Sequence, residues 1–558
     1  TLDQDRAKLL NDVFAAKFAK PSALTLPTAP DYAVDCLSRL SVSEAAVRAA
    51  LKAIPVSKAC GPDDISARII VECADELVVP LTKICNASVS SGVFPMRWKQ
   101  ANIIPIFKKG DKKDPLNYRS VSLLPLFGKI LERVVYEQLF QHVSSSLCDE
   151  QHGFIPRRSC ITNLSVYLQS AWEAISDGYQ TDAIYTDYSA AFQSVNHTLL
   201  IHKLRNSFKL DGPALDWFVS YLSDRRQRVI VNGKTSNWTK VLSGVPEGSL
   251  LAPLLFSLFI NDLPREVTSG CLLYADDVKI FRKIVSPSDG LLLQEDLDRL
   301  AAWSVRWGLT LNPKKCRSFT MTLRRAPVQT RYYIDRCELE HVVEMRDLGI
   351  TLDAKLTFAP HVSNIVRAAN RSLGLLRRSF SYRSSVCRFD KNALVCSYFS
   401  HVRSILEYGS VIWTGAADTH TVRIDRVQHK FLIWLLSHSS SGQATSLSYP
   451  DLLKHFGIPS LACRRKQHDL MFIRNLFHSR LDSRLLLQSF SLNAPTRSIR
   501  TPRLFYEPHP RVNTVKRGLF FRVPQLVNEF LRSVPAADLF ADTAGTFKTH
   551  VRNFISSF

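Results

Sequence analysis

The stretch Tyr274-Ala275-Asp276-Asp277 decides the fold, because it places two adjacent carboxylates at a turn between two apolar runs. Cys271-Leu272-Leu273 leads into the turn and Val278-Lys279-Ile280-Phe281 leads out, and both runs are short and rich in β-forming residues. Adjacent acids repel each other unless a cation lies between them, which favours a metal-binding hairpin. An Asp-Asp pair taken alone is more typical of a solvated turn than of a metal site.

A third carboxylate occurs in a matching setting upstream. Residues 182–186 (DAIYT) have the composition of a strand that ends at Asp187, and residues 188–197 change to helical spacing. Two strands that end in Asp and pack side by side could hold two Mg²⁺ ions about 3.5–4 Å apart, the arrangement used for in-line phosphoryl displacement. The sequence therefore predicts a two-metal nucleotidyl-transfer site built from Asp187, Asp276 and Asp277.

These residues belong to an ordered series of motifs that resembles the reverse transcriptase of non-LTR (LINE-type) retrotransposons, nearest the jockey-like group. The series comprises GPDDI (61–65), IPIFKKGD (104–111), NYRSVSL (117–123), QHGF (151–154), GVPEGS (244–249), YADD (274–277), LNPKKC (311–316), LGITLD (348–353) and LEY (406–408). Each piece is weakly diagnostic, but so many in order are specific and cover nearly the whole chain. The resemblance implies an α+β right-hand polymerase with fingers, an antiparallel palm sheet and a thumb, followed by a mainly helical basic C-terminal region.

The resemblance also implies roles for individual residues. Asp187, Asp276 and Asp277 match the catalytic, metal-binding carboxylates, with the backbone carbonyl of Tyr188 as a further ligand. The expected cofactors are two Mg²⁺ ions, which Mn²⁺ can replace. Phe192 matches an aromatic residue under the incoming sugar, where a ring would clash with a 2′-hydroxyl and so select dNTPs over the rNTPs of an RNA-dependent RNA polymerase. The other substrate-binding candidates are Lys108, Lys109, Arg119, Gly244, Pro246, Glu247, Gly248, Ser249 and Lys315.

The chemistry of these candidates suits a nucleoside triphosphate. Arg119 offers a fork of donors, and Lys108 or Lys109 offers a mobile ammonium that can match phosphate charge. A solvated surface charge explains Lys108 and Lys109 equally well. Lys315 resembles the family lysine near the departing phosphates. Glycines within residues 244–249 would let the backbone approach the nascent base pair closely.

The chain also departs from the family pattern. Glu247 stands where the family has Gln, Gln193 where it has Asp, and Ser120 where it has Pro. The further departures are Asp64, Arg157 and Ala252 in place of Gly, and Ile155 in place of Arg. An added acid beside phosphates and metals would weaken nucleotide binding. The sequence therefore predicts an encoded but impaired RNA-directed DNA polymerase, and the alternative is a non-catalytic nucleic-acid-binding relic.

Charge and composition favour a polyanionic partner. The 558 residues carry a net charge of +22. Residues 361–558 contain 28 Lys and Arg against 11 Asp and Glu, whereas residues 1–360 contain 44 against 39. We therefore expect template RNA and a DNA primer as partners, with much of the phosphate contact made by the C-terminal third. No run reaches the roughly 20 apolar residues of a membrane span, so no membrane partner is expected. The oligomeric state stays open.

The twelve cysteines contain no CxxC pair. A zinc knuckle is therefore not expected, and scattered thiols fit a reducing compartment. We expect a ribonucleoprotein of the nucleus and cytoplasm. The chain begins with Thr1 and nothing in it resembles the endonuclease of the family, which favours an N-terminally truncated fragment.

Four regions are expected along the chain. They are a helical N-terminal extension (1–90), fingers and palm (91–358), a helical thumb (359–436) and a basic helical C-terminal region (437–558). Helical spacing is expected over Asp5 to Phe18 and over Asp31 to Leu51. Tyr332-Tyr333-Ile334 and Asp347 to Leu352 are expected to form one primer-holding hairpin. The Ser-rich stretch Ser437 to Ser448 is expected to be a flexible link.

Overall fold

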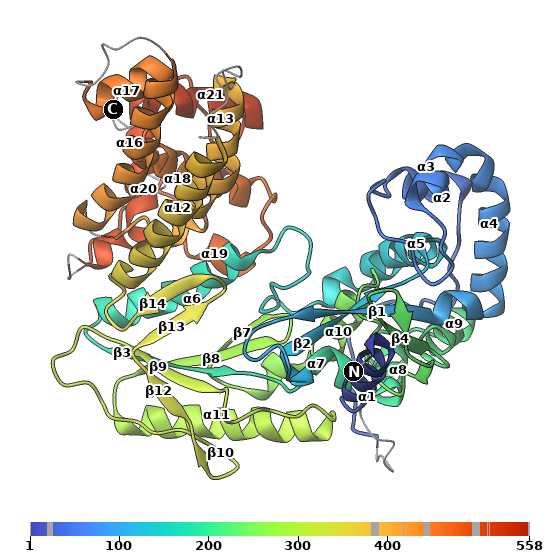
Figure 1. Cartoon of the computed structure of the whole chain (residues 1–558). Helices are drawn as coiled ribbons and strands as arrows, with labels where there is room; N and C mark the ends of the chain where they lie inside the picture. The colour runs from blue at the N-terminus through green and yellow to red at the C-terminus, as the bar shows by residue number, and fades with distance from the viewer. Residues whose placement is uncertain are drawn as a thin grey trace.

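The computed structural model of the chain describes residues 2–18, 26–380, 390–416, 418–439, 447–493, 503–510, 512 and 514–555. Two sheets and their covering helices form one side of the molecule, and the helices after residue 358 gather over one end of it (Figure 1). Most of the expected link at Ser437 to Ser448 lies outside the described residues.

A five-stranded sheet carries the YADD turn. Its strands, in spatial order, are β12 (Glu340–Val342), β9 (Arg317–Met321), β3 (Gln180–Thr186), β8 (Asp277–Ile284) and β7 (Gly270–Tyr274). The pairs β9–β3, β3–β8 and β8–β7 are antiparallel, whereas β12 runs parallel to β9. The expectation of an antiparallel sheet is therefore wrong at the β12 edge.

Both faces of this sheet are buried, which explains the apolar runs around the turn. Ile184 and Ile280 belong to one hydrophobic core, and their chain neighbours Ala183 and Phe281 belong to another. The helices α6 (Cys160–Ser176) and α11 (Pro287–Arg306) both pack against the sheet (Figure 1). The central strands are thereby fixed from two sides.

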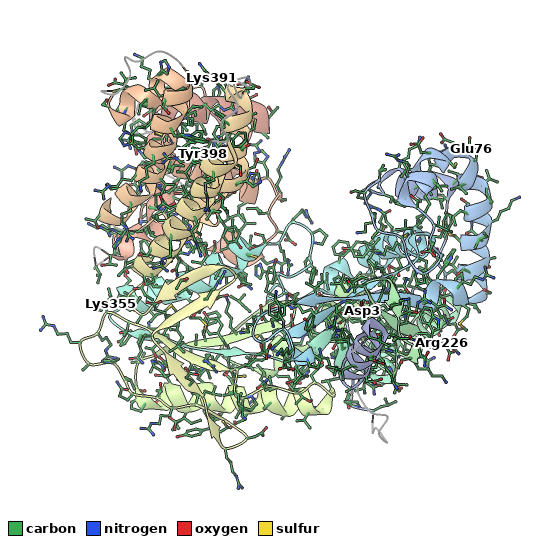
Figure 2. The ribbon with its side chains drawn as sticks, in the orientation of Figure 1. Asp3, Glu76, Arg226, Lys355, Lys391 and Tyr398 are labelled. Carbon is green, nitrogen blue, oxygen red and sulfur yellow. The ribbon has the colours of Figure 1, made fainter. Side chains whose placement is uncertain are left out.

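A second sheet lies beside the first (Figure 1). It is formed by β2 (Tyr118–Leu123), β1 (Gln100–Phe107), β4 (Arg226–Val231), β5 (Lys234–Thr235) and β6 (Thr239–Lys240). The N-terminal helix α1 (Asp3–Ala15) packs on this sheet, with Phe14 in one small core with Ile103 and Val229. The Asn11 amide donates to Thr239 Oγ1 at 2.8 Å. Figure 2 labels Asp3 of this helix and Arg226 of the sheet.

Helices surround the second sheet and the core beneath it. They are α2 (Glu44–Lys52), α3 (Ala67–Glu72), α4 (Ala74–Ser91), α5 (Leu126–Val143), α7 (Ala191–Ser194), α8 (His197–Asn206), α9 (Gly212–Leu222) and α10 (Ala252–Phe259). The helix expected over Asp31 to Leu51 begins only at Glu44. Upstream of it, Leu37 exchanges backbone hydrogen bonds with Lys209 and Asp211. This long-range pairing overrides the local helical spacing.

Two separate hairpins replace the single primer-holding hairpin expected from the sequence. One joins β10 (Tyr333–Ile334) to β11 (Cys337–Glu338), and the other joins β13 (Glu344–Asp347) to β14 (Ile350–Asp353). Leu348 and Gly349 form the turn of the second hairpin with φ of 44° and 89°. A two-residue turn with positive φ at both positions connects adjacent antiparallel strands directly. β13 therefore pairs with β14, and β10 pairs with β11.

The rest of the described chain is helical. Its helices are α12 (Ala359–Phe380), α13 (Lys391–Tyr398), α14 (Ser404–Glu407), α15 (Ser410–Trp413), α16 (Asp418–Ser439), α17 (Tyr449–Phe456), α18 (Leu461–Phe477), α19 (Arg484–Gln488), α20 (Leu519–Ser533) and α21 (Ala544–Ile555). Tyr398, labelled in Figure 2, stacks on Phe431 at 4.0 Å between ring centroids. Helices α15, α19 and α20 pack on α6, so this helical part is joined to the central sheet. In the described part of the chain, no helix is both long and apolar enough to cross a membrane.

Candidate nucleotidyl-transfer site

Strand register brings the three predicted carboxylates to one end of the central sheet. Thr186 of β3 pairs with Val278 of β8, so Asp187 follows one strand where Asp277 begins the other. Tyr274 pairs with Asp277, which leaves Ala275-Asp276 as a two-residue turn. Asp187 and Asp277 line the same pocket. The structure therefore places Asp187, Asp276 and Asp277 next to one another.

The three carboxylates act on one another electrostatically. Desolvation, followed by the charge of Asp187, raises the pKa of Asp276. Desolvation, followed by the charges of Asp276, Asp347 and Asp187, raises the pKa of Asp277 to about 6. Concentrated negative charge of this kind is what a bound divalent cation relieves.

The donor chemistry fits Mg²⁺, which prefers carboxylate oxygens together with substrate phosphates. Across the described ranges, no group of three or more His, Cys, Asp or Glu side chains is gathered closely enough to hold a metal by itself. Lys315 Nζ lies 3.0 Å from Oδ1 of Asp187, so an ammonium already neutralises one carboxylate. The buried ring of Tyr188 points to the core, where its hydroxyl lies 3.0 Å from Ser304 Oγ, which leaves its backbone for the site.

Residues 150–153 hold the turn at residues 274–277 in place. Gln151 Oε1 accepts hydrogen bonds from the backbone N–H groups of Ala275, at 3.0 Å, and Gly153, at 2.8 Å. A Cβ on Gly153 would lie 2.2 Å from the nitrogen of Ala275. Ala275 has a φ of 56°, a left-handed conformation that such contacts must maintain. Sequence reasoning missed both Gln151 and Gly153 as site residues, and only their motif pointed to them.

The predicted basic residues lie on the β1–β2 hairpin and beside Asp187. Lys108 follows β1, and Arg119 in β2 pairs with Ile106. Desolvation and the charges of Arg119, Lys315 and Lys109 lower the pKa of Lys108, whereas Asp187 raises it. A cationic group thus faces the carboxylates from the neighbouring sheet.

Phe192 lies in the short helix α7, close behind Asp187. Its ring stacks on Phe256 with centroids 4.4 Å apart and planes 14° apart. Phe154 meets it edge-on at 6.2 Å. Packing against Phe154 and Phe256 fixes the orientation of the Phe192 ring.

The loop 243–249 runs between α7 and β2. A Cβ on Gly244 would lie 2.7 Å from Cα of Gln193, and one on Gly248 would lie 2.6 Å from the carbonyl oxygen of Ser122. Ser249 is buried, and its Oγ accepts from the N–H of Ala252 at the start of α10. Pro246 and Glu247 line a pocket on the α1 side of the loop. Gly244 and Gly248 therefore let the backbone of this loop lie close to α7 and β2.

A pocket beside the carboxylates is closed by the β13–β14 hairpin. Lys279 of β8 donates to Oδ2 of Asp347 in β13 at 2.5 Å, and the Tyr185 hydroxyl donates to the same oxygen at 3.0 Å. Both ends of the ion pair are buried. Sequence reasoning gave Lys279 no role, because its partner is far away in the chain.

Comparisons with known proteins show which family this chain is similar to. Residues 108–352 match the family model described as reverse transcriptase (RNA-dependent DNA polymerase). The chain is 32% identical over 394 residues to the probable RNA-directed DNA polymerase from transposon BS of Drosophila melanogaster. This alignment covers 68% of this chain and 43% of that relative. The chain is 30% identical over 490 residues to the RNA-directed DNA polymerase from mobile element jockey of the same species, which covers 85% of this chain and 52% of the relative.

These similarities assign the chain to the reverse transcriptase class. Within that class, the chain belongs to the reverse transcriptases of non-LTR (LINE-type) retrotransposons. The resemblance inferred from the ordered motifs is therefore confirmed. The chain spans about half the length of the curated relatives that it matches.

Proposed function

We propose that this chain is an RNA-directed DNA polymerase that adds dNTPs to a primer 3′ end on an RNA template. One observation carries the proposal. Asp187, Asp276 and Asp277 meet at the ends of paired strands, and the cations Lys108, Arg119 and Lys315 act on them electrostatically. Carboxylates opposed by phosphate-binding cations are the elements that nucleotidyl transfer needs.

In this proposal the sheet β12–β7 is the palm, the sheet around β1–β2 belongs to the fingers, and α12 begins the thumb. The regions 1–90, 91–358, 359–436 and 437–558 then serve as extension, fingers with palm, thumb and basic C-terminal region. The excess of Lys and Arg in residues 361–558 supports a role of the last two regions in holding template RNA and DNA primer. We further propose that the chain acts as part of a ribonucleoprotein in the nucleus and cytoplasm.

The residues divide the chemistry among them. When bound, two Mg²⁺ ions would supply activation of the primer hydroxyl and neutralise charge on the leaving pyrophosphate. Asp187, Asp276 and Asp277, with the Tyr188 carbonyl, would hold the ions. Arg119 and the ammonium groups of Lys108 and Lys315 orient the triphosphate.

Phe192 would exclude a 2′-hydroxyl by packing against the sugar, because its own ring is fixed by Phe256. The loop with Gly244, Pro246, Glu247, Gly248 and Ser249 would form the floor of the nucleotide subsite. Its two tight glycine contacts hold that floor against α7 and β2.

A second candidate, a weakened relic that only binds nucleic acid, is favoured by two backbone positions. Asp64 and Arg157 stand where the family pattern has Gly, and both keep positive φ, 55° and 66°. A side chain in this region costs roughly 1–2 kcal/mol per residue. The relic would retain fold and charge without turnover.

Primer extension on an RNA template with Mg²⁺ and dNTPs separates the two candidates. Asp276→Ala should lower the extension rate by at least about 1000-fold, because a carboxylate that holds the metals is lost. Asp335→Ala is the matched control, since Asp335 also lies in a hairpin turn, between β10 and β11, and should leave the rate unchanged. Equal extension by the wild type and Asp276→Ala would contradict the proposed role of Asp276, and wild-type extension no faster than background would favour the relic.

A further inference from the structure

Three residues that depart from the family pattern contact one another. Ser120 lies in β2, Gln193 in α7 and Glu247 in the loop 243–249. The Gln193 amide donates to Oε1 of Glu247 at 3.2 Å and to Ser120 Oγ at 3.0 Å. Ser120 Oγ donates to Oε2 of Glu247 at 3.1 Å. We name Ser120, Gln193 and Glu247 the amide–acid cluster.

The cluster is chemically complete. An ionised carboxylate only accepts hydrogen bonds, and both oxygens of Glu247 have a donor. The Gln193 amide supplies one of these donors, and the Ser120 hydroxyl passes on the hydrogen bond that it receives. One acid and one amide are required, but the two can change places without loss of the pairing. The family pattern has Asp at position 193 and Gln at 247, so this chain carries the exchanged arrangement.

Two cations partly offset the burial of the Glu247 carboxylate, although burial is the larger effect. Arg119 and Lys17, which follows α1, are the cations whose charges favour the ionised form of Glu247. Burial works in the opposite direction and raises its pKa. A partly buried carboxylate that accepts hydrogen bonds at both oxygens is a satisfied group, not an isolated acid.

The cluster joins the three segments that carry the nucleotide-binding candidates. Ser120 follows Arg119, Gln193 follows Phe192, and Glu247 precedes Gly248. Backbone bonds reinforce the connection, since Val245 donates its N–H to the Phe192 carbonyl at 2.9 Å. The separation between the phosphate-binding strand and the ring that screens the sugar therefore depends on this cluster.

We propose that the amide–acid cluster is a positioning device that sets Arg119 against Phe192, and that Gln193 and Glu247 are a compensated exchange. This inference rests on the proposed polymerase function. It assigns Ser120 and Gln193 a role in nucleotide selection. It also implies that Glu247 does not mark a damaged site, so that restoring Gln at position 247 alone harms the enzyme.

Four versions of the 558-residue chain test the proposal: the wild type, Gln193→Glu, Glu247→Gln and the exchange variant with both changes. Extension of oligo(dT) on poly(rA) gives kcat and KM for dTTP, and the ratio of kcat/KM for dTTP to that for UTP reports sugar selection. Gln193→Glu places a second carboxylate against that of Glu247 and should raise KM for dTTP at least about tenfold. It should also lower the ratio of kcat/KM for dTTP to that for UTP. Glu247→Gln should raise KM by a smaller factor. The exchange variant should return to within about threefold of the wild type, as a restored pair predicts.

The decisive result is a change of sign. Glu247→Gln should harm the wild type but improve the Gln193→Glu protein. Losses that simply multiply, or a gain from Glu247→Gln alone, would overturn the proposal. Exchange of Gln169 and Glu173 on α6, an amide–acid pair joined at 2.6 Å outside the site, is the control and should leave both readouts unchanged.

A failure of the polymerase function itself would be recognised separately, as wild-type extension no faster than background. Urea unfolding of the same four proteins then tests the cluster. The midpoint should fall for Glu247→Gln in the wild type and rise for the same change in Gln193→Glu. A fall in both backgrounds would refute the cluster.

Discussion

At the residue scale, Gly153 shows how one missing side chain fixes the catalytic turn. The backbone N–H groups of Gly153 and Ala275 both donate to Gln151 Oε1. A Cβ at position 153 would clash with the backbone of Ala275. The colliding atom is backbone, so neither partner can move away by changing rotamer. The turn that carries Asp276 is therefore placed by a segment more than a hundred residues upstream.

We expect Gly153→Ala to lower the primer-extension rate at least about tenfold, because a displaced turn misplaces the carboxylates it carries. Circular dichroism should show a folded protein. Gly374→Ala is the control, since a Cβ at Gly374 meets nothing within 4 Å and lies in the helix α12. A Gly153→Ala enzyme with normal turnover would show that the turn needs no such contact.

Asp277 gives a prediction about pH. Its pKa is raised from 3.8 to about 6 in the folded chain, by desolvation first and then by Asp276, Asp347 and Asp187. Between these two values the folded state binds more protons than the unfolded state, so stability falls as pH rises. Above about pH 6 the full destabilising effect of the ionised group is present.

Asp277→Asn removes this ionisation and should raise Tm by about 1–2 °C at pH near 8, measured in EDTA. The gain should shrink as pH falls through about 6 and vanish below the unfolded pKa, because both states of the wild type are then protonated. A gain that is constant with pH would assign the effect to packing instead of charge.

At the scale of elements, one buried ion pair joins the catalytic hairpin to the β13–β14 hairpin. Lys279 and Asp347 have side chains that are 5% and 7% exposed, so neither charge can be solvated if its partner is removed. Lys283, also on β8, forms an ion pair with Asp177 at 2.6 Å, but the two side chains are 41% and 55% exposed. The two pairs differ mainly in burial.

Lys279→Met should lower the free energy of unfolding by about 3–5 kcal/mol, because it leaves a buried carboxylate without a partner. Lys283→Met should change it by less than about 1 kcal/mol. Urea unfolding of both variants measures the difference. Adding Asp347→Asn should recover part of the loss in Lys279→Met, and equal losses at the two lysines would contradict the argument.

The order of elements around the carboxylates was predictable because its signals are local. A strand that ends in Asp187 and a turn at Asp276 are visible in a few neighbouring residues, and β3 and β8 carry them. The bond between Lys279 and Asp347 has no local signal, since each residue alone resembles an ordinary surface charge. The same limit explains why residues 31–43 were mistaken for a helix: their pairing with Lys209 and Asp211 is invisible in the segment itself.

At the scale of the whole molecule, positive charge and helical structure are both concentrated after residue 358. Arg367, Arg371 and Arg378 lie exposed on α12. Arg377 differs from them, because it donates to the Lys430 carbonyl at 2.6 Å and so holds α12 to α16. The exposed arginines are the ones free to meet a phosphate backbone.

Changing Arg367, Arg371 and Arg378 to Gln should weaken binding to an RNA–DNA primer-template. The slope of log Kd against log salt should fall by about 0.9 for each phosphate that the variant no longer neutralises. Fluorescence anisotropy across a salt series measures this slope. Gln in place of Arg68 and Lys83, exposed on α3 and α4, removes two charges elsewhere and is the control when each change in slope is divided by the number of charges removed. An unchanged slope in the α12 variant would remove that helix from the nucleic-acid interface.

The packing of α1 has a consequence for how the chain is made. Asn11 is separated from Thr239 by 228 residues, yet the two side chains bond to each other. At about 5–20 residues per second, a ribosome needs roughly 10–45 s to synthesise the intervening chain. Leu10 and Phe14 share their small core with Ile103 of β1 and Val229 of β4, so this core is complete only once β4 has been synthesised. The helix α1 is therefore secured in its final place only after β4 and β6 have been synthesised, far downstream in the chain.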